Sequence, residues 1–324
     1  DKLLFFAKRN NFNTLILYQL NKVDKRLSLS DPRKNNTLAE FISKAKVKFS
    51  MKQIGASGEA ASFFTDVIDV YNKTRNKPEE KFDIYNLEYE YWSKKASGID
   101  GYYCVNYLEE NNITCNREGS FNYFISNLKT LKSISKGSKH KINIEAYVGY
   151  FTKNEISEIT KYCDRILIHA YGKTPKISFS IAKNSLNHLY KLNNKVKTSI
   201  LFSTRMDQLG YWLKFESLGT CETQFYKEMN IKNINLKKKL NLDGFSYHTY
   251  SFLEKSINAI CLSSKKASEV ELASGDILCS HPDKDCIIVT PDMLRNGMEW
   301  TQYFYVVGHT RTLDAALKAF NLNQ

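Results

Sequence analysis

The strongest constraint on the fold is an alternation that repeats through the first 250 residues: a helical stretch, a short run of β-branched and aromatic residues, and a polar loop. The strand-like runs are TLILYQL (14–20), KVKFSMKQIGAS (46–57), FDIYNLEYEYW (82–92), INIEAYVGYF (142–151), DRILIHAYG (164–172), VKTSILFST (196–204) and LDGFSYHTYSFL (242–253). The helical stretches are residues 1–12, 37–45, 59–75, 121–134, 154–163, 178–192 and 221–230. Such an alternation is typical of parallel strands joined through helices.

Seven strands separated by helices favour an eight-stranded α/β barrel over an open doubly wound sheet, because no Gly-rich phosphate loop follows any of them. The sequence therefore predicts a (β/α)8 TIM barrel over residues 1–262. Its first strand is absent from the N-terminus, since the chain opens on a helix. That strand either precedes Asp1 or is supplied by another part of the chain, and no cofactor is expected.

The alternation stops after about residue 262, and residues 263–324 are predicted to form a small appended region. A β-hairpin is expected around GDILCSHPDKDCIIV (275–289). The run WTQYFYVVGHT (300–310) and the helical TLDAALKAFNL (312–322) follow it. A strand and a helix from this region would complete the barrel if that strand paired with residues 14–20. Alternatively, the region offers a surface for a protein partner.

Composition narrows the class of protein. With 42% hydrophobic residues the chain can bury a large core, and it has no apolar run of about 18 residues that could span a bilayer. Its N-terminus lacks the order of a signal peptide. The net charge of +13 is scattered over the sequence, with NLKKKLNL (235–242) as the dense run, so a solvated surface is expected rather than a nucleic-acid interface.

The seven cysteines contain no Cys-x-x-Cys pair, and the histidines lack metal-ligand spacing, so no metal site is expected. Two pairs are close enough in sequence for disulfides, Cys104 with Cys115 and Cys279 with Cys286. Reduced buried thiols are the other interpretation. A disulfide would favour an exported protein, whether secreted, periplasmic or on the cell surface.

The segment 82–92 places Asn86, Glu88 and Glu90 on one face of a strand and apolar residues on the other. On an antiparallel sheet the polar face would simply be exposed to solvent. Inside a barrel it would point into the lumen, where carboxylates must be paired, protonated or catalytic. Glu88 and Glu90 would stand about 7 Å apart. Their repulsion would raise the pKa of one, and a carboxylic acid beside a carboxylate is what glycosidic cleavage requires.

This segment resembles the motif Asp-x-x-Asp-x-Asp-x-Glu on the fourth barrel strand of glycoside hydrolase family 18, the chitinases and endo-β-N-acetylglucosaminidases. Asp83, Asn86, Glu88 and Glu90 stand at its four spacings. The helices before and after the segment are similar, and QIGAS loosely resembles the Gly-containing end of the third strand. The resemblance covers residues 1 to about 252 and also leaves the first strand absent.

The resemblance implies a retaining, substrate-assisted glycosidase in which the substrate's own acetamide oxygen is the nucleophile. Glu90 matches the general acid, Glu88 the residue that holds the acetamide, and Tyr171 the tyrosine that orients it. The remaining motif positions, Asp83 and Asn86, belong to the same implied catalytic set. The expected glycan-binding residues are Trp92, Glu145, Tyr147, Tyr150, His248 and Tyr250. Glu145 either adds a carboxylate to the cleft or pairs with a Lys or Arg.

Four positions depart from the family pattern. Asn86 and Glu88 replace aspartates, Gly172 replaces the aspartate after Tyr171, and His248 stands where strand eight carries a tryptophan. These changes leave a second hypothesis open, a chitinase-like protein that binds N-acetylated glycans without efficient turnover. A third is a scaffold subunit that holds a partner through its basic exterior or its C-terminal region.

Overall fold

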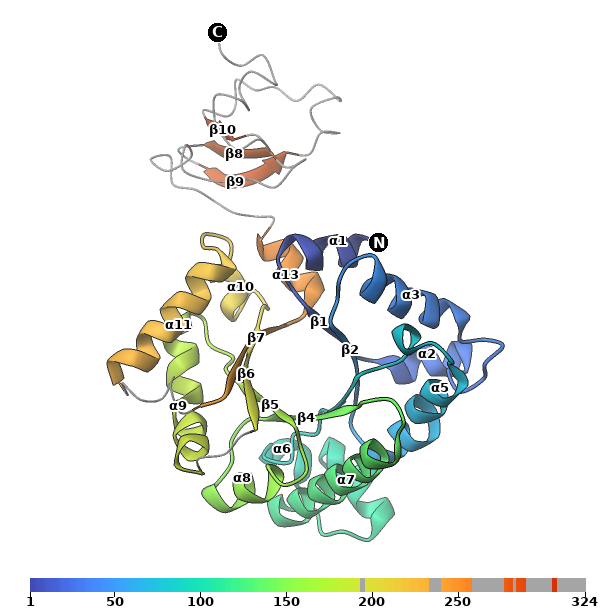
Figure 1. The fold of residues 1–324 in the computed structure, drawn as a ribbon. Coiled ribbons are helices and arrows are strands. Elements are labelled where there is room, and N and C mark those ends of the chain that lie inside the picture. Colours follow the sequence, from blue (N-terminus) through green and yellow to red (C-terminus); the bar gives the residue numbers. More distant parts are fainter. Residues whose placement is uncertain (193–195, 233–239, 258–276, 282–283, 290–304, 308–324) are drawn as a thin grey trace. The chain divides into compact units, whose positions relative to one another are not determined.

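The computed structural model describes residues 1–192, 196–232, 240–257, 277–281, 284–289 and 305–307 (Figure 1). Seven strands form one sheet in strict chain order. They are β1 (Thr14–Leu17), β2 (Gln53–Gly58), β3 (Ile84–Leu87), β4 (Asn143–Val148), β5 (Arg165–His169), β6 (Lys197–Ser203) and β7 (Leu242–His248). Neighbouring strands from β1 to β6 pair in parallel. Each of the seven predicted runs therefore contains a strand, although residues 250–253 of the last run begin helix α13 and residues 46–47 of the second end helix α3.

Helices separate these strands. They are α1 (Lys2–Arg9), α2 (Leu20–Leu27), α3 (Asn36–Val47), α4 (Ala61–Phe63), α5 (Asp69–Thr74), α6 (Lys94–Ser97), α7 (Arg117–Gly137), α8 (Lys153–Ile159), α9 (Pro175–Leu192), α10 (Leu209–Trp212), α11 (Leu218–Lys232) and α13 (Tyr250–Ile257). Each predicted helical stretch overlaps at least one of them, and the stretch 59–75 holds both α4 and α5. A π-helical turn, Phe64–Ile68, joins α4 to α5.

The strand order distinguishes an α/β barrel from an open doubly wound sheet, the two architectures compared from the sequence. A doubly wound sheet reverses its strand order at a switch point. Here the order β1 to β7 never reverses, and right-handed crossovers in one direction keep the connecting helices on one face. Figure 1 shows α3, α5, α7 and α8 on the same side of the strands. The fold is therefore TIM-barrel-like, as predicted, with seven strands in the part that the structure describes.

The first of two compact units comprises residues 1–170, 180–201 and 229–246. Strands β2 to β5 have buried interiors, as expected for parallel strands covered by helices, whereas β1 is half-buried. All four residues of β3 are buried, and β4 is buried from its second residue onward. The buried side chains of the helices include Ile42 of α3, Tyr71 of α5, Phe124 and Leu128 of α7 and Ile156 of α8.

The second compact unit comprises residues 171–179, 202–228 and 247–324. Phe202, Phe225 and Leu253 are buried in it, and the Tyr247 hydroxyl donates to Glu222, 3.0 Å away. Near the C-terminus, β8 (Ile277–His281) and β9 (Lys284–Val289) pair antiparallel, which confirms the predicted hairpin.

The run 300–310 does contain a strand, β10 (Tyr305–Val307), but it pairs antiparallel with β8. The partner that the structure shows for this strand is the hairpin, and completion of the barrel beside residues 14–20 stays a prediction. The predicted helix at 312–322 lies outside the described residues, and so do the side chains of Cys279 and Cys286.

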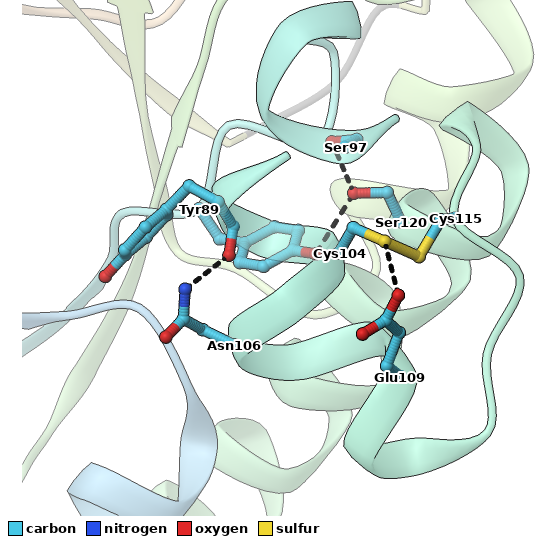
Figure 2. The surroundings of a disulfide bond; sticks show 8 residues. Tyr89, Ser97, Cys104, Asn106, Glu109, Cys115 and Ser120 are labelled. Carbon is cyan, nitrogen blue, oxygen red and sulfur yellow. Dashed lines mark hydrogen bonds between the residues drawn. A yellow bond between two sulfur atoms is a disulfide. The ribbon is translucent and has the colours of Figure 1, made fainter. Parts of the chain in front are cut away.

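Cys104 and Cys115 form a disulfide, with their Cα atoms 5.2 Å apart, as the sequence predicted for this pair (Figure 2). The bond closes a segment after β3 that contains a π-helical turn, Cys104–Leu108, and a 3-10 turn, Glu109–Asn111. Two other cysteines of the described part, Cys163 and Cys221, are buried and reduced.

Loss of this disulfide should destabilise the fold measurably. Replacing Cys104 and Cys115 together by serine frees a short loop in the unfolded chain, which costs about 3 kcal/mol of unfolding free energy in the chain-entropy model. Urea denaturation with and without dithiothreitol measures it. Reductant should destabilise the wild type and leave the double variant unchanged, and a wild type insensitive to reductant would contradict the bond.

Candidate active site

Two carboxylates follow the C-terminal end of β3, the edge where α/β barrels carry their active sites. The sequence predicted a strand that continues to residue 92 and includes Glu88 and Glu90. This is wrong, because β3 ends at Leu87 and both carboxylates lie beyond it. The neighbouring strand β2 ends at Gly58, whose carbonyl accepts from the Glu88 amide at 2.9 Å. The predicted alternation of faces nevertheless continues past the strand.

Tyr89 and Tyr91 fix this alternation. Both are fully buried, whereas Glu88 and Glu90 are half-buried. The hydroxyl of Ser120 on α7 donates to the Tyr89 oxygen at 3.1 Å, and Ser97 lies 2.9 Å from Ser120 (Figure 2). The tyrosines are thus anchored toward α7, and the alternation turns the two carboxylates away from that helix.

Burial raises the pKa of both Glu88 and Glu90. Burial raises the pKa of Glu88, the Ser57 hydroxyl 2.9 Å away opposes this, and the charges of Glu59 and Glu90 add to it. Burial also raises the pKa of Glu90, the Tyr147 hydroxyl opposes this, and Glu59 adds to it. The segment therefore carries two neighbouring carboxyl groups that are suited to holding a proton.

Glu59 is a third carboxylate of this cluster, and sequence reasoning missed it. It directly follows β2, and it accepts hydrogen bonds from the hydroxyls of Tyr102 at 2.8 Å and Tyr107 at 2.6 Å. The sequence interpretation made Glu59 the first residue of the helix 59–75. Its position at the end of a barrel strand was the available signal, because such ends gather at the same edge as Glu88.

Aromatic side chains lie beside the carboxylates. The ring of Trp92 meets that of Tyr147 edge-on, with centroids 5.3 Å apart. His169, which sequence reasoning left out of the site, lies 6.3 Å from Tyr147 and 6.1 Å from Tyr150 by ring centroids. Burial lowers the pKa of His169 to about 4, so its ring is neutral at neutral pH. Tyr150 is 57% exposed and offers a ring face to solvent.

Gly149 makes room for Trp92 at the end of β4. A Cβ at this position would lie 2.5 Å from the indole Nε1, closer than packing permits. Gly149→Ala should therefore displace the indole and change the intrinsic tryptophan fluorescence while the far-ultraviolet circular dichroism stays the same. Gly137→Ala is the matched control, because nothing lies within 4 Å of a Cβ there. Identical spectra for wild type and Gly149→Ala would contradict this packing.

Asn86 and Glu145 belong to a buried polar row beneath the carboxylates. Ser57, Asn86, Glu145 and Arg165 are register partners on successive strands. Ser57 donates to the Asn86 Oδ1 at 2.8 Å, and the Asn86 amide donates to Glu145 Oε1 at 2.7 Å. Arg165 forms an ion pair with Glu145, which is fully buried. Of the two roles considered for Glu145, the pairing with an arginine is the one that the structure shows.

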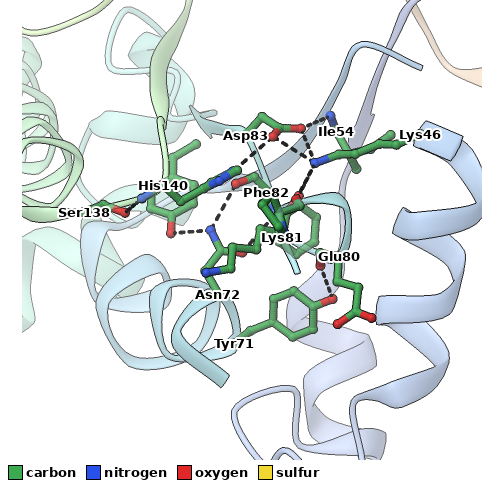
Figure 3. Close-up of polar contacts among 12 residues, drawn as sticks. Lys46, Ile54, Tyr71, Asn72, Glu80, Lys81, Phe82, Asp83, Ser138 and His140 are labelled. Atoms are coloured by element: carbon green, nitrogen blue, oxygen red, sulfur yellow. Dashed lines mark hydrogen bonds and ion pairs between the residues drawn. The ribbon is translucent and has the colours of Figure 1, made fainter. Parts of the chain in front are cut away.

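Asp83 lies at the opposite end of β3, before the strand begins (Figure 3). It accepts from the Ile54 amide at 2.9 Å and pairs with Lys46 at 2.7 Å and His140 at 3.1 Å. The structure thus separates Asp83 from Glu88 and Glu90, with which the motif had grouped it. The hydrogen bond from the Ile54 amide and the contacts with Lys46 and His140 hold the start of the strand in place.

The same arrangement recurs two strands along. Asp164, which precedes β5, accepts from the Ile144 amide at 2.8 Å and pairs with Lys132 of α7 at 2.7 Å. In both places an aspartate before one strand binds the second amide of its neighbour and a lysine from the helix that precedes that neighbour. Because Asp164 belongs to no motif, the repetition supports a structural role for Asp83.

Tyr171, His248 and Tyr250 belong to the second compact unit. Tyr171 follows β5, and His248 ends β7 with a pKa that burial lowers. The Tyr250 hydroxyl donates to Glu254 at 2.9 Å. The convergence of these three residues with Glu90 stays a prediction.

No protein-family model matches the chain, and no curated protein matches it. Within the described residues, the group nearest to a metal-binding arrangement is Cys104, Glu109 and Cys115, whose two sulfurs are joined in the disulfide. No helix of the described part is long and apolar enough to cross a bilayer. The chemistry of the carboxylate cluster is therefore the basis for a functional proposal.

Proposed function

We propose that this protein is a glycoside hydrolase of the family 18 type that cleaves N-acetylglucosamine-containing glycans. The observation that carries the proposal is the pair Glu88 and Glu90, two residues apart at the C-terminal end of a parallel strand, each with a raised pKa. Family 18 places its acid and its acetamide-holding residue at this spacing. The ring of Trp92 beside the pair would offer a surface for a sugar ring.

In the proposed reaction, protonated Glu90 gives its proton to the glycosidic oxygen as the bond from that oxygen to C1 breaks. The acetamide carbonyl oxygen of the same sugar attacks C1 and forms an oxazolinium ion. Glu88 accepts a hydrogen bond from the acetamide N–H and stabilises the developing positive charge. Ionised Glu90 then removes a proton from water as the water attacks C1 and the bond from C1 to the acetamide oxygen breaks, so the acetamide is restored and the sugar leaves with its original configuration.

A second candidate is a glycan-binding protein without efficient turnover, which Asn86 favours. The Asn86 amide donates to Glu145, so Asn86 presents only its oxygen to Ser57 and cannot take a proton from Glu88. Glu88 is also one methylene longer than the aspartate of the family, and a displacement of about 1 Å can cost about a hundredfold in rate. Binding requires only that the site retain its shape.

Incubation with chitooligosaccharides and with an N-glycan tests the proposal. Proton NMR should show new reducing ends that appear first as the β-anomer, because the mechanism retains configuration. Saturable binding without cleavage would favour the second candidate. If the protein neither cleaves nor binds any N-acetylated sugar, both candidate functions are overturned. The disulfide supports our further proposal that the protein is exported, because disulfides persist in oxidising compartments.

A further inference from the structure

The loop that follows β4, residues 149–152, presents an exposed aromatic ring from a backbone that is held in place. Tyr150 is 57% exposed. The Tyr150 carbonyl accepts from the Arg117 guanidinium at 2.9 Å. At the end of the loop, the Thr152 amide donates to Glu155 at 2.6 Å, as part of the capping box of α8. One partner of each bond belongs to the ion pair between Arg117 and Glu155, so the orientation of the loop follows that of this pair.

Arg117, the first residue of α7, joins this loop to the segment that carries the two carboxylates. Its Nε donates to Glu155 Oε1 at 3.0 Å and its Nη2 donates to Glu155 Oε2 at 2.9 Å. Its Cζ lies 5.5 Å from the centroid of the buried Tyr91 ring, over the ring face. The Tyr91 ring in turn meets that of Trp92 edge-on, with centroids 5.3 Å apart. One guanidinium thus contacts both the loop after β4 and the segment 88–92.

The geometry of these contacts is more specific than stability requires. A partly exposed ion pair contributes little to the free energy of unfolding, and 41% of the Arg117 side chain is exposed. A bidentate pair with a carboxylate nevertheless fixes the plane of the guanidinium, which a lysine cannot reproduce. A fixed plane determines where the third acceptor, the Tyr150 carbonyl, lies. The arrangement is therefore suited to orienting the loop.

We propose that Arg117 is a positioning residue of the sugar site, which holds the loop so that the Tyr150 ring is already in place to stack on a sugar ring. This inference rests on the proposed function. A side chain that is ordered before binding loses less conformational entropy when the ligand arrives, so Arg117 raises the affinity for the glycan. Because Arg117 acts through Tyr150, it affects binding more than bond cleavage.

Arg117→Met tests this role, because it removes the guanidinium and keeps an unbranched apolar side chain over Tyr91. In the Glu90→Gln background, calorimetric titration should show that the affinity for a chitooligosaccharide falls about two- to tenfold, the typical contribution of one aromatic contact. In the active protein KM should rise while kcat changes little. In a Tyr150→Ala background the same substitution should have little further effect, because Arg117 acts through that ring.

Hydrogen exchange of residues 149–155, measured by mass spectrometry, reports on the loop without a sugar. We expect exchange about tenfold faster in Arg117→Met, because hydrogen bonds from a charged group are lost. Arg75→Met is the matched control. The Arg75 guanidinium also lies over a buried tyrosine, with its Cζ 6.0 Å from the Tyr71 ring centroid, and donates to a backbone carbonyl, that of Pro32 at 3.3 Å. This control should change neither the exchange of the loop nor the affinity.

The two measurements distinguish failure of the inference from failure of the proposed function. If exchange becomes faster in Arg117→Met but the wild type binds no N-acetylated sugar, Arg117 holds the loop as inferred and the proposed function fails. If the wild type binds the sugar and a folded Arg117→Met binds it equally well, the inference is overturned. Losses that add in the double variant Arg117→Met, Tyr150→Ala would also overturn it, because Arg117 would then act through another group.

Discussion

Replacing Glu90 with glutamine should lower kcat/KM toward chitooligosaccharides by about 10²- to 10⁴-fold, the usual contribution of a general acid or base. The amide has the size of the carboxyl group and cannot transfer a proton, so kcat should fall while KM changes little. The loss should be smaller for an aryl glycoside, whose leaving group departs without full protonation. Reducing-end assays on both substrates measure the difference.

Glu110→Gln serves as the control for this variant, because it makes the same chemical change at an exposed position. Its kinetics should match the wild type. If the wild type is active and Glu90→Gln cleaves the oligosaccharide at the same rate, Glu90 is not a catalytic residue. Equal losses on the oligosaccharide and the aryl glycoside would contradict its role as the acid for the leaving group.

Replacing Arg165 with methionine should lower the free energy of unfolding by about 3 to 5 kcal/mol, which is the cost of breaking a buried ion pair at one partner. Glu145 is fully buried, and without Arg165 its remaining hydrogen-bond donor from the neighbouring strand is Asn86. The charge would then have no counterion. Urea denaturation of wild type and variant, followed by circular dichroism, measures the loss.

The loss should depend on pH in a defined direction. Burial raises the pKa of Glu145, and Arg165 and Asn86 oppose this, so removal of Arg165 raises the pKa further. A carboxyl group with a raised pKa in the folded state contributes stability below its unfolded pKa and loses it as pH rises toward the folded value. Arg165→Met should therefore be closer to wild type at pH 4 than at pH 8.

The double variant Glu145→Gln, Arg165→Met is the control for this result. It removes the buried charge together with its partner, so it should recover part of the stability that Arg165→Met loses. A double variant that is less stable than the wild type by the sum of the losses of Glu145→Gln and Arg165→Met would show that the pair is not coupled. The ion pair between Glu145 and Arg165 would then contribute no coupling free energy to the stability of the polar row.

Local patterns predicted the seven strands and the helices between them, because each strand is a compact run of β-branched and aromatic residues between polar loops. The end of β3 could not be predicted in this way. Tyr89 and Tyr91 continue the apolar alternation past Leu87 because they pack toward α7, not because the backbone is paired. Sequence periodicity reports burial, and it does not distinguish burial in a sheet from burial against a helix.

Contacts between distant residues account for the other differences. Glu59 meets tyrosines 43 and 48 residues away, and no local pattern indicates that pairing. The strand in residues 300–310 was predicted correctly, but its partner is β8, which only the tertiary fold determines. Asp83 matched a motif by spacing, yet its neighbours Lys46 and His140 come from other parts of the sequence and hold it at the strand start.

Calorimetric titration of Glu90→Gln with a chitooligosaccharide tests the central claim most directly, because this variant presents the site without consuming the sugar. We expect saturable binding that Trp92→Ala weakens at least severalfold in the same background, since Trp92 follows Glu90 by two residues and its indole packs against Tyr147. Binding that is absent for every N-acetylated oligosaccharide, in a variant that circular dichroism shows to be folded, would contradict a sugar site at the end of β3.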